Sequence, residues 1–213
     1  ARQTRVPAGS ALVVDRLHFS DGMTRAISNH PGIEVVREER EYLPTGPGVV
    51  ATGPLTSPAM AAAMGRHLGR EGLAFFDAIA PIVHRESLND SVVFQAGRFG
   101  EDADYLNCPM GGEEYHAFLS ALRAADVHPG HDFDAVPYFE GCLPVEVMAS
   151  RGDDTLRFGP MKPIGLTDPR SGRRPWAVVQ LRREDRAGQM WNLVGFQTRL
   201  RVGEQGRVFR MIP

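Results

Sequence analysis

One of the two cysteines of this chain has the sequence surroundings of a reactive thiol. Cys142 lies within residues 139–146, where Gly141 leaves the approach to the sulfur open and Pro144 suits the first turn of a short helix. Unpaired backbone N–H groups at a helix N-terminus stabilise a thiolate and lower the thiol pKa. Cys142 is therefore a candidate nucleophile. The alternative is a buried structural cysteine, which free cysteines often are.

A second candidate segment, residues 157–165, reads Arg-Phe-Gly-Pro-Met-Lys-Pro-Ile-Gly. It holds Lys162, the only lysine among the 24 basic residues. In a chain that otherwise uses arginine, one lysine is consistent with a need for a compact ammonium group. Chance codon usage explains it equally well.

Composition narrows the class of protein. The chain has 213 residues, enough for one large domain or two small ones, with hydrophobic (42%) and charged (23%) fractions ordinary for a globular protein. It has no apolar run long enough to span a membrane and no visible signal peptide. Two cysteines without close spacing favour neither a disulfide scaffold nor a zinc site. We therefore expect a cytoplasmic protein without a metal.

Charge is distributed unevenly along the chain. Residues 151–213 hold thirteen Lys and Arg against six Asp and Glu, whereas residues 1–150 hold eleven against twenty. A basic C-terminal part favours an anionic partner such as a phosphate, a folate carboxylate or RNA. A solvated basic face without a partner is the competing interpretation.

Hydrophobic periodicity and turn residues predict a mixed α/β chain. The helix at residues 113–125 is the clearest, because Tyr115, Phe118, Leu119 and Leu122 fall on one face. Residues 48–54 form a continuous apolar run closed by Ala-Thr-Gly, which is typical of a parallel strand in a dinucleotide-binding sheet. The other predicted helices are residues 19–29, 58–69, 144–150 and 202–211, and the other predicted strands are residues 11–14, 33–36, 75–83, 90–99, 104–110, 176–181 and 191–196, the last two as an antiparallel pair.

Seven motif blocks, in order along nearly the whole chain, resemble the folate- and FAD-dependent tRNA (uracil-5-)-methyltransferases, relatives of the flavoprotein that modifies the tRNA wobble uridine. The blocks are residues 13–16, 51–57, 76–83, 105–110, 139–146, 156–163 and 192–198.

The resemblance implies a discontinuous, Rossmann-like FAD-binding domain and an inserted substrate-facing domain with a mixed sheet and helices. Residues 1–57 would belong to the first, residues 58–195 to the insertion, and residues 196–213 would return to the FAD-binding domain. It also implies the reaction: methylenetetrahydrofolate donates a methylene group, reduced FAD supplies electrons, NAD(P)H re-reduces the flavin, and a T-loop uridine of tRNA gains a methyl group at C5. The implied partners are tRNA and folate, without DNA or a membrane.

The resemblance also assigns site residues. Uracil C5 becomes nucleophilic when a thiolate adds to C6, and Cys142 matches the family cysteine given this covalent or acid–base work. Gly53, Gly159, Pro160 and Lys162 would contact the cofactor, and Lys162 would face a reduced flavin or a folate charge, unless it is a solvated turn residue. Cys108 is interpreted as structural. Candidate contacts to tRNA phosphates, which are alternatively a surface charge cluster, are Arg173, Arg174, Arg182 and Arg183.

Two departures from the family pattern matter. Arg199 stands where many relatives carry histidine, so no imidazole role is implied there. The G-x-G-x-x-G fingerprint and a second family cysteine are absent, so we expect an internal piece of a longer enzyme that alone is inactive and binds FAD poorly. A wobble-uridine modifying flavoprotein and a non-catalytic RNA-binding or interaction module of the same fold remain as alternatives.

Overall fold

The computed structural model describes residues 2–9, 11–53, 56–69, 80–100, 103–128 and 143–213. The chain forms two compact units, the first made of Ala1–Ala26, Ala78–His128 and Cys142–Pro213, the second of Ile27–Asp77 and Pro129–Gly141. These units follow internal packing; the division into residues 1–57, 58–195 and 196–213 stays a prediction. Helices and antiparallel sheets together confirm the mixed α/β class.

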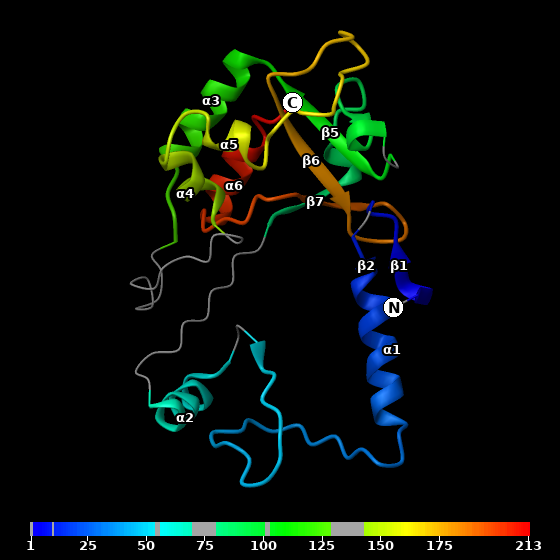
Figure 1. The fold of residues 1–213 in the computed structure, drawn as a ribbon, viewed down its shortest axis with the longest axis vertical. Coiled ribbons are helices and arrows are strands. Elements are labelled where there is room, and N and C mark those ends of the chain that lie inside the picture. The colour runs from blue at the N-terminus through cyan, green and yellow to red at the C-terminus, as the bar shows by residue number, and fades with distance from the viewer. Residues whose placement is uncertain (1, 10, 54–55, 70–79, 101–102, 129–142) are drawn as a thin grey trace. The chain divides into compact units, whose positions relative to one another are not determined.

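A five-stranded antiparallel sheet organises the first unit (Figure 1). The strand order is β3-β7-β6-β5-β4, and the predicted pairing of residues 176–181 with residues 191–196 is confirmed as β6 against β7. Cys108 is opposite Val179, so the apolar side chains of alternate positions share one face. The strands are β3 (Ile82–His84), β4 (Phe94–Gln95), β5 (Tyr105–Met110), β6 (Ala177–Arg183) and β7 (Met190–Leu193).

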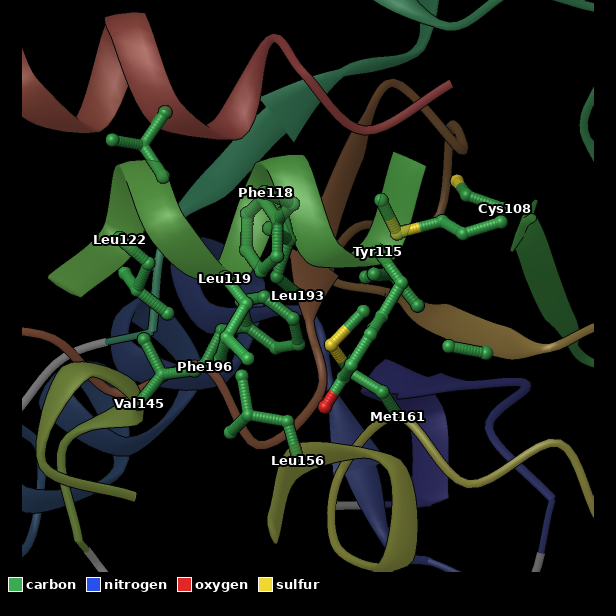
Figure 2. Packing of buried hydrophobic residues seen from close by; sticks show 14 of the residues in the cluster. Cys108, Tyr115, Phe118, Leu119, Leu122, Val145, Leu156, Met161, Leu193 and Phe196 are labelled. Carbon is green, nitrogen blue, oxygen red and sulfur yellow. The ribbon is translucent and has the colours of Figure 1, made fainter. Parts of the chain in front are cut away.

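Helices cover the apolar face of this sheet. The predicted apolar face of α3 (Gly112–Arg123) is confirmed, since all four of its large side chains are buried. Shorter helices complete the layer: α4 (Val145–Ser150), α5 (Thr155–Phe158) and α6 (Val202–Phe209). In Figure 2 the ring of Phe118 lies close to Phe196, with ring centroids 6.2 Å apart. The core therefore joins residues far apart in sequence.

The N-terminal residues add a small hairpin and a helix. A short 3₁₀ helix (Arg2–Thr4) precedes β1 (Arg5–Val6), which pairs with β2 (Val13–Val14) before α1 (Arg16–Ser28) begins. The predicted start at residue 19 is wrong, because the Asp15 carboxylate accepts the His18 N–H at 3.0 Å and caps the helix three residues earlier. This bond, and a second one from the His18 ring at 2.9 Å, lower the pKa of Asp15 to about 2.

The second unit contains the predicted helix α2 (Pro58–Leu68). Ser57 caps its start through an Oγ contact with the Met60 N–H at 3.4 Å, and Gly69 ends it in the left-handed conformation. The strand predicted at residues 33–36 is absent. Of the strand predicted at residues 48–54, the described residues 48–53 form none, and Val49 is 89% exposed. A strand requires a hydrogen-bonded neighbour, and the described residues supply none to these segments.

Two further strand predictions are corrected in part. Residues 90–99 form a strand only at Phe94–Gln95, and 3₁₀ turns lie at Arg85–Ser87 and Arg98–Gly100. Of residues 75–83, only the end falls in the described part, where β3 begins at Ile82. No helix in the described ranges is long and apolar enough to cross a bilayer. Among those same residues, no group of three or more His, Cys, Asp or Glu side chains is placed to hold a metal ion.

Candidate functional site

The start of α4 is fixed by a bond from a distant segment. Cys142 itself lies outside the described residues, which resume at Leu143. Pro144 occupies the N-cap position, and the Val145 N–H donates to the Gln197 carbonyl at 2.7 Å. The first helical N–H is therefore paired, contrary to the expectation of unpaired donors at this helix mouth.

Glu146 strengthens this junction, and the sequence analysis did not single it out. Its carboxylate accepts the Thr198 hydroxyl at 2.9 Å and the Arg199 N–H at 2.8 Å. At the other end of α4, the Arg123 Nε donates to the Ala149 carbonyl at 2.8 Å. The helix that follows Cys142 is thus held at both ends. An acidic residue in the first helical turn was the only signal available in the sequence.

The segment after α5 forms a second part of the site. Gly159 ends α5, and a Cβ built there would lie 2.9 Å from the Thr155 carbonyl oxygen, so the helix itself requires glycine. The Met161 side chain is fully buried, and its carbonyl accepts the Val178 N–H of β6 at 3.0 Å. This segment is therefore hydrogen-bonded to β6 at one point.

Pro160 joins this segment to the residues that follow β7. It packs against Gly195, whose φ is +77° and whose Cβ, if present, would lie 2.8 Å from the Pro160 Cβ. Since Gln197 and Thr198 contact the start of α4, three motif blocks meet in one place: residues 143–146, 156–163 and 192–198. The structure thus brings together segments that the sequence could only list in order.

Lys162 is presented outward from a fixed backbone. Its neighbours Met161 and Pro163 are buried, whereas Lys162 is exposed. Among the described residues its ammonium group has no hydrogen-bond or ion-pair partner. The arrangement holds a positive charge at a defined place on the surface, where an anionic group can be recognised.

Gly53 lies in the other unit, at the end of the described residues 11–53. Its φ of +69° favours glycine, and no atom lies within 4 Å of a Cβ built there. The Thr56 hydroxyl donates to the Gly53 carbonyl at 2.7 Å. The open space beside this backbone fits the close approach of a cofactor.

The four candidate RNA-contacting arginines fall into two groups. Arg173 and Arg174 are exposed in the turn before β6, whereas Arg182 and Arg183 end that strand. Arg182 pairs with Glu184 at 3.3 Å, and the Arg183 guanidinium lies 5.3 Å from the centre of the Trp191 ring. The structure does not gather these arginines into one cluster.

Cys108 lies in the middle of β5 and is 3% exposed. Burial raises its thiol pKa to about 12, so a thiolate does not form there near neutral pH. The structural interpretation of this cysteine is confirmed. Cys108 also lines a cavity of about 760 Å³ between α6 and the β3 edge of the sheet, and none of the predicted site residues lines that cavity.

Comparison with known proteins extends these observations. The family described as glucose inhibited division protein A matches residues 1–213. The chain is 57% identical over 215 residues to the methylenetetrahydrofolate–tRNA-(uracil-5-)-methyltransferase TrmFO of Moorella thermoacetica, and 58% identical over 209 residues to that of Rubrobacter xylanophilus. The identity to the Thermus thermophilus protein of the same name is 56% over 209 residues. These matches cover 98–100% of this chain but 46–49% of the relatives, so the chain spans about half their length.

Proposed function

Because the chain belongs to the glucose inhibited division protein A family, we propose that it is part of a flavin- and folate-dependent tRNA methyltransferase that forms 5-methyluridine in the T-loop. The observation that carries this proposal is the convergence of three motif blocks near the start of α4, in a chain 56–58% identical to methylenetetrahydrofolate–tRNA-(uracil-5-)-methyltransferases. The predicted division into an FAD-binding domain and a substrate-facing insertion, and a place in the cytoplasm, belong to the same proposal.

Cys142 is the proposed nucleophile of this reaction. Its thiolate adds to uracil C6, and the electron pair of the C5–C6 double bond becomes available at C5 for attack on the methylene carbon of the folate. Loss of the C5 proton and release of the folate nitrogen from the transferred carbon would leave an exocyclic methylene on C5. Addition of a hydride equivalent to this methylene would form the methyl group, and the returning electron pair would restore the C5–C6 double bond and expel the Cys142 thiolate. The Glu146 carboxylate accepts hydrogen bonds from Thr198 and Arg199, and we call these two bonds the clamp. The clamp fixes α4, which begins at Val145, three residues after Cys142.

Lys162 fits an anionic cofactor, because it offers an ammonium group that no described residue neutralises. Gly53, which lies in the other unit, leaves open space beside its own backbone and is a separate candidate contact. Reduced FAD, itself re-reduced by NAD(P)H, supplies the two electrons that convert the transferred methylene into a methyl group. Lys162 would stabilise the negative charge that accompanies this reduction or the charge of the folate.

The basic residues suggest how the tRNA is held. Arg173 and Arg174 are exposed and free of acidic partners in the described part, so they are the better candidates for phosphate contacts. Arg182 and Arg183 are engaged within the fold by Glu184 and Trp191. We therefore assign the phosphate contacts to the turn before β6.

A covalent trap tests the proposal. The full-length protein is incubated with T-arm RNA that contains 5-fluorouridine, and the adduct is detected on a denaturing gel. In 5-fluorouridine a fluorine replaces the C5 hydrogen, so the proton loss that would release the enzyme cannot occur. Cys142→Ala is expected to abolish the adduct, whereas Cys108→Ala, which removes the buried thiol, leaves it intact. Adduct formation by Cys142→Ala would refute the assignment. A wobble-uridine modifying enzyme would instead trap an anticodon stem-loop.

A further inference from the structure

A chain of polar side chains lies on the sheet face opposite the hydrophobic core. Asn107 and Gln180 are paired across β5 and β6, and the Gln180 Nε2 donates to the Asn107 Oδ1 at 2.9 Å. Arg98 donates from Nε to the Gln180 Oε1 at 3.0 Å. It donates from Nη1 to the Ile164 carbonyl at 2.6 Å. We call this chain, from Asn107 through Gln180 and Arg98 to Ile164, the Arg98 relay.

The direction of every bond in the relay is determined. Because the Gln180 oxygen faces the Arg98 N–H, its amide nitrogen must face the Asn107 oxygen. The Asn107 nitrogen then donates to the Phe94 and Ala96 carbonyls, at 3.2 and 3.0 Å. Asn107 is fully buried with its donors and acceptor satisfied, so the relay has one arrangement.

The backbone next to Arg98 reinforces the same contact. Phe99 adopts the left-handed conformation, with φ of 57° and ψ of 28°, which is unfavourable for a residue with a bulky side chain. Its N–H donates to the Gly165 carbonyl at 3.2 Å. Its ring covers Gly165, where a built Cβ would lie 3.0 Å from the ring carbons. The 3₁₀ turn Arg98–Gly100 therefore packs closely against the backbone at Gly165.

These contacts anchor residues 161–165, which we call the lysine loop, at two points. On one side of Lys162, the Met161 carbonyl is bound by β6; on the other side, the Ile164 and Gly165 carbonyls are bound by Arg98 and Phe99. Lys162 is the exposed cation between these anchors. We propose that Arg98 is a positioning residue that fixes the lysine loop and thereby sets where the Lys162 ammonium stands against a bound anionic group. The identity of that group as a flavin or folate rests on the proposed function.

The first arm of the test is independent of any cofactor. Hydrogen exchange of residues 161–166 is measured in the full-length protein for wild type, Arg98→Ala and Arg98→Lys. Arg98→Ala is expected to raise the exchange rate there by at least about tenfold. Arg98→Lys should raise it by less, because a lysine ammonium can reach one of the two acceptors, the Gln180 side chain or the Ile164 carbonyl, but not both at once. Arg85→Ala, which removes a half-buried arginine paired with Asp90, is the control and should leave these rates unchanged. Rates within twofold of wild type in Arg98→Ala overturn the inference.

The second arm uses the flavin as a reporter. Sulfite adds to an oxidised flavin and leaves a negative charge on the ring, so a nearby cation strengthens binding. Lys162→Met and Arg98→Ala should each weaken sulfite binding by roughly tenfold or more, and the double variant should be no weaker than Lys162→Met. Effects that multiply in the double variant would show that Arg98 acts separately from Lys162 and would overturn the inference. If the wild-type protein binds no flavin and forms no methyluridine, the proposed function is refuted. The hydrogen-exchange measurement then still decides whether Arg98 holds the lysine loop.

Discussion

Removal of the Glu146 carboxylate should loosen the junction between α4 and the segment that follows β7. The substitution Glu146→Ala deletes the acceptor of both the Thr198 hydroxyl, at 2.9 Å, and the Arg199 N–H, at 2.8 Å. A hydrogen bond to a charged group contributes about 1.5–3 kcal/mol. Because Glu146 is half-buried and water can replace part of the loss, we expect the local opening free energy to fall by about 2–4 kcal/mol.

The amide exchange of residues 199 and 200 reports this loss directly. The Arg199 N–H bonds to Glu146, and the Leu200 N–H bonds to the Thr198 hydroxyl at 3.1 Å. At about 1.4 kcal/mol per factor of ten, the expected loss corresponds to roughly 30- to 1,000-fold faster exchange. The measurement is made by mass spectrometry on the full-length protein, where global unfolding is not required.

Two further variants make this prediction specific. Glu146→Gln keeps an oxygen for the Arg199 N–H and places an amide donor next to the Thr198 oxygen, so exchange should rise less than about tenfold. Glu113→Ala removes an exposed carboxylate from the first turn of α3 and should change nothing at residues 199 and 200. If Glu146→Ala accelerates exchange there by less than about threefold, the clamp does not hold this junction.

Three other outcomes follow from the structure. Gly195→Ala should lower the thermal unfolding midpoint, because the left-handed backbone and a 2.8 Å clash cost about 2 kcal/mol or more, whereas Gly203→Ala in α6, which meets no atom within 4 Å, should be neutral or stabilising. Hydrogen bonds from His18 lower the pKa of the Asp15 carboxyl from 3.8 to about 2, so this carboxylate stabilises the fold above pH 3.8 and loses its contribution as the pH falls towards 2. The difference in thermal unfolding midpoint between wild type and Asp15→Asn should therefore be largest at about pH 6 and shrink below about pH 4. A difference that does not depend on pH would contradict this. Cys108 should resist iodoacetamide at pH 8 until the protein is unfolded, so peptide mapping that finds it alkylated in the native protein would refute its burial.

Local patterns in the sequence were sufficient where an element carries its own signals. The apolar face of α3, the helix at the place of α2 and the β6–β7 pair are all present as predicted. Each depends on periodicity or on turn residues close in sequence. Of the strand predicted at residues 48–54, the described residues 48–53 form none, because apolar composition alone cannot supply a hydrogen-bonded neighbour.

The contacts that build the site could not be predicted from local patterns. Glu146 is 52 residues from Thr198, and Arg98 is 66 residues from Ile164. Neither Asn107, which is fully buried in β5, nor Gly195 was among the site residues predicted from the sequence. Their partners are set by sheet register and loop packing, which a single sequence does not specify.

The distinction between an enzyme and a non-catalytic module of the same fold depends on very few residues. Glu146, Thr198 and Gly195 are explained by the packing of their own segments, so a binding module with this fold would need them as much as an enzyme does. Lys162 differs, because its backbone is fixed on both sides while its charge meets no described partner. A module that only binds RNA gains little from fixing the backbone beside one lysine, since phosphate contacts tolerate flexible attachment. Stabilisation of a charge that appears at one atom during a reaction does require such fixing, and on this ground the loop and its Arg98 anchor favour catalysis over simple binding.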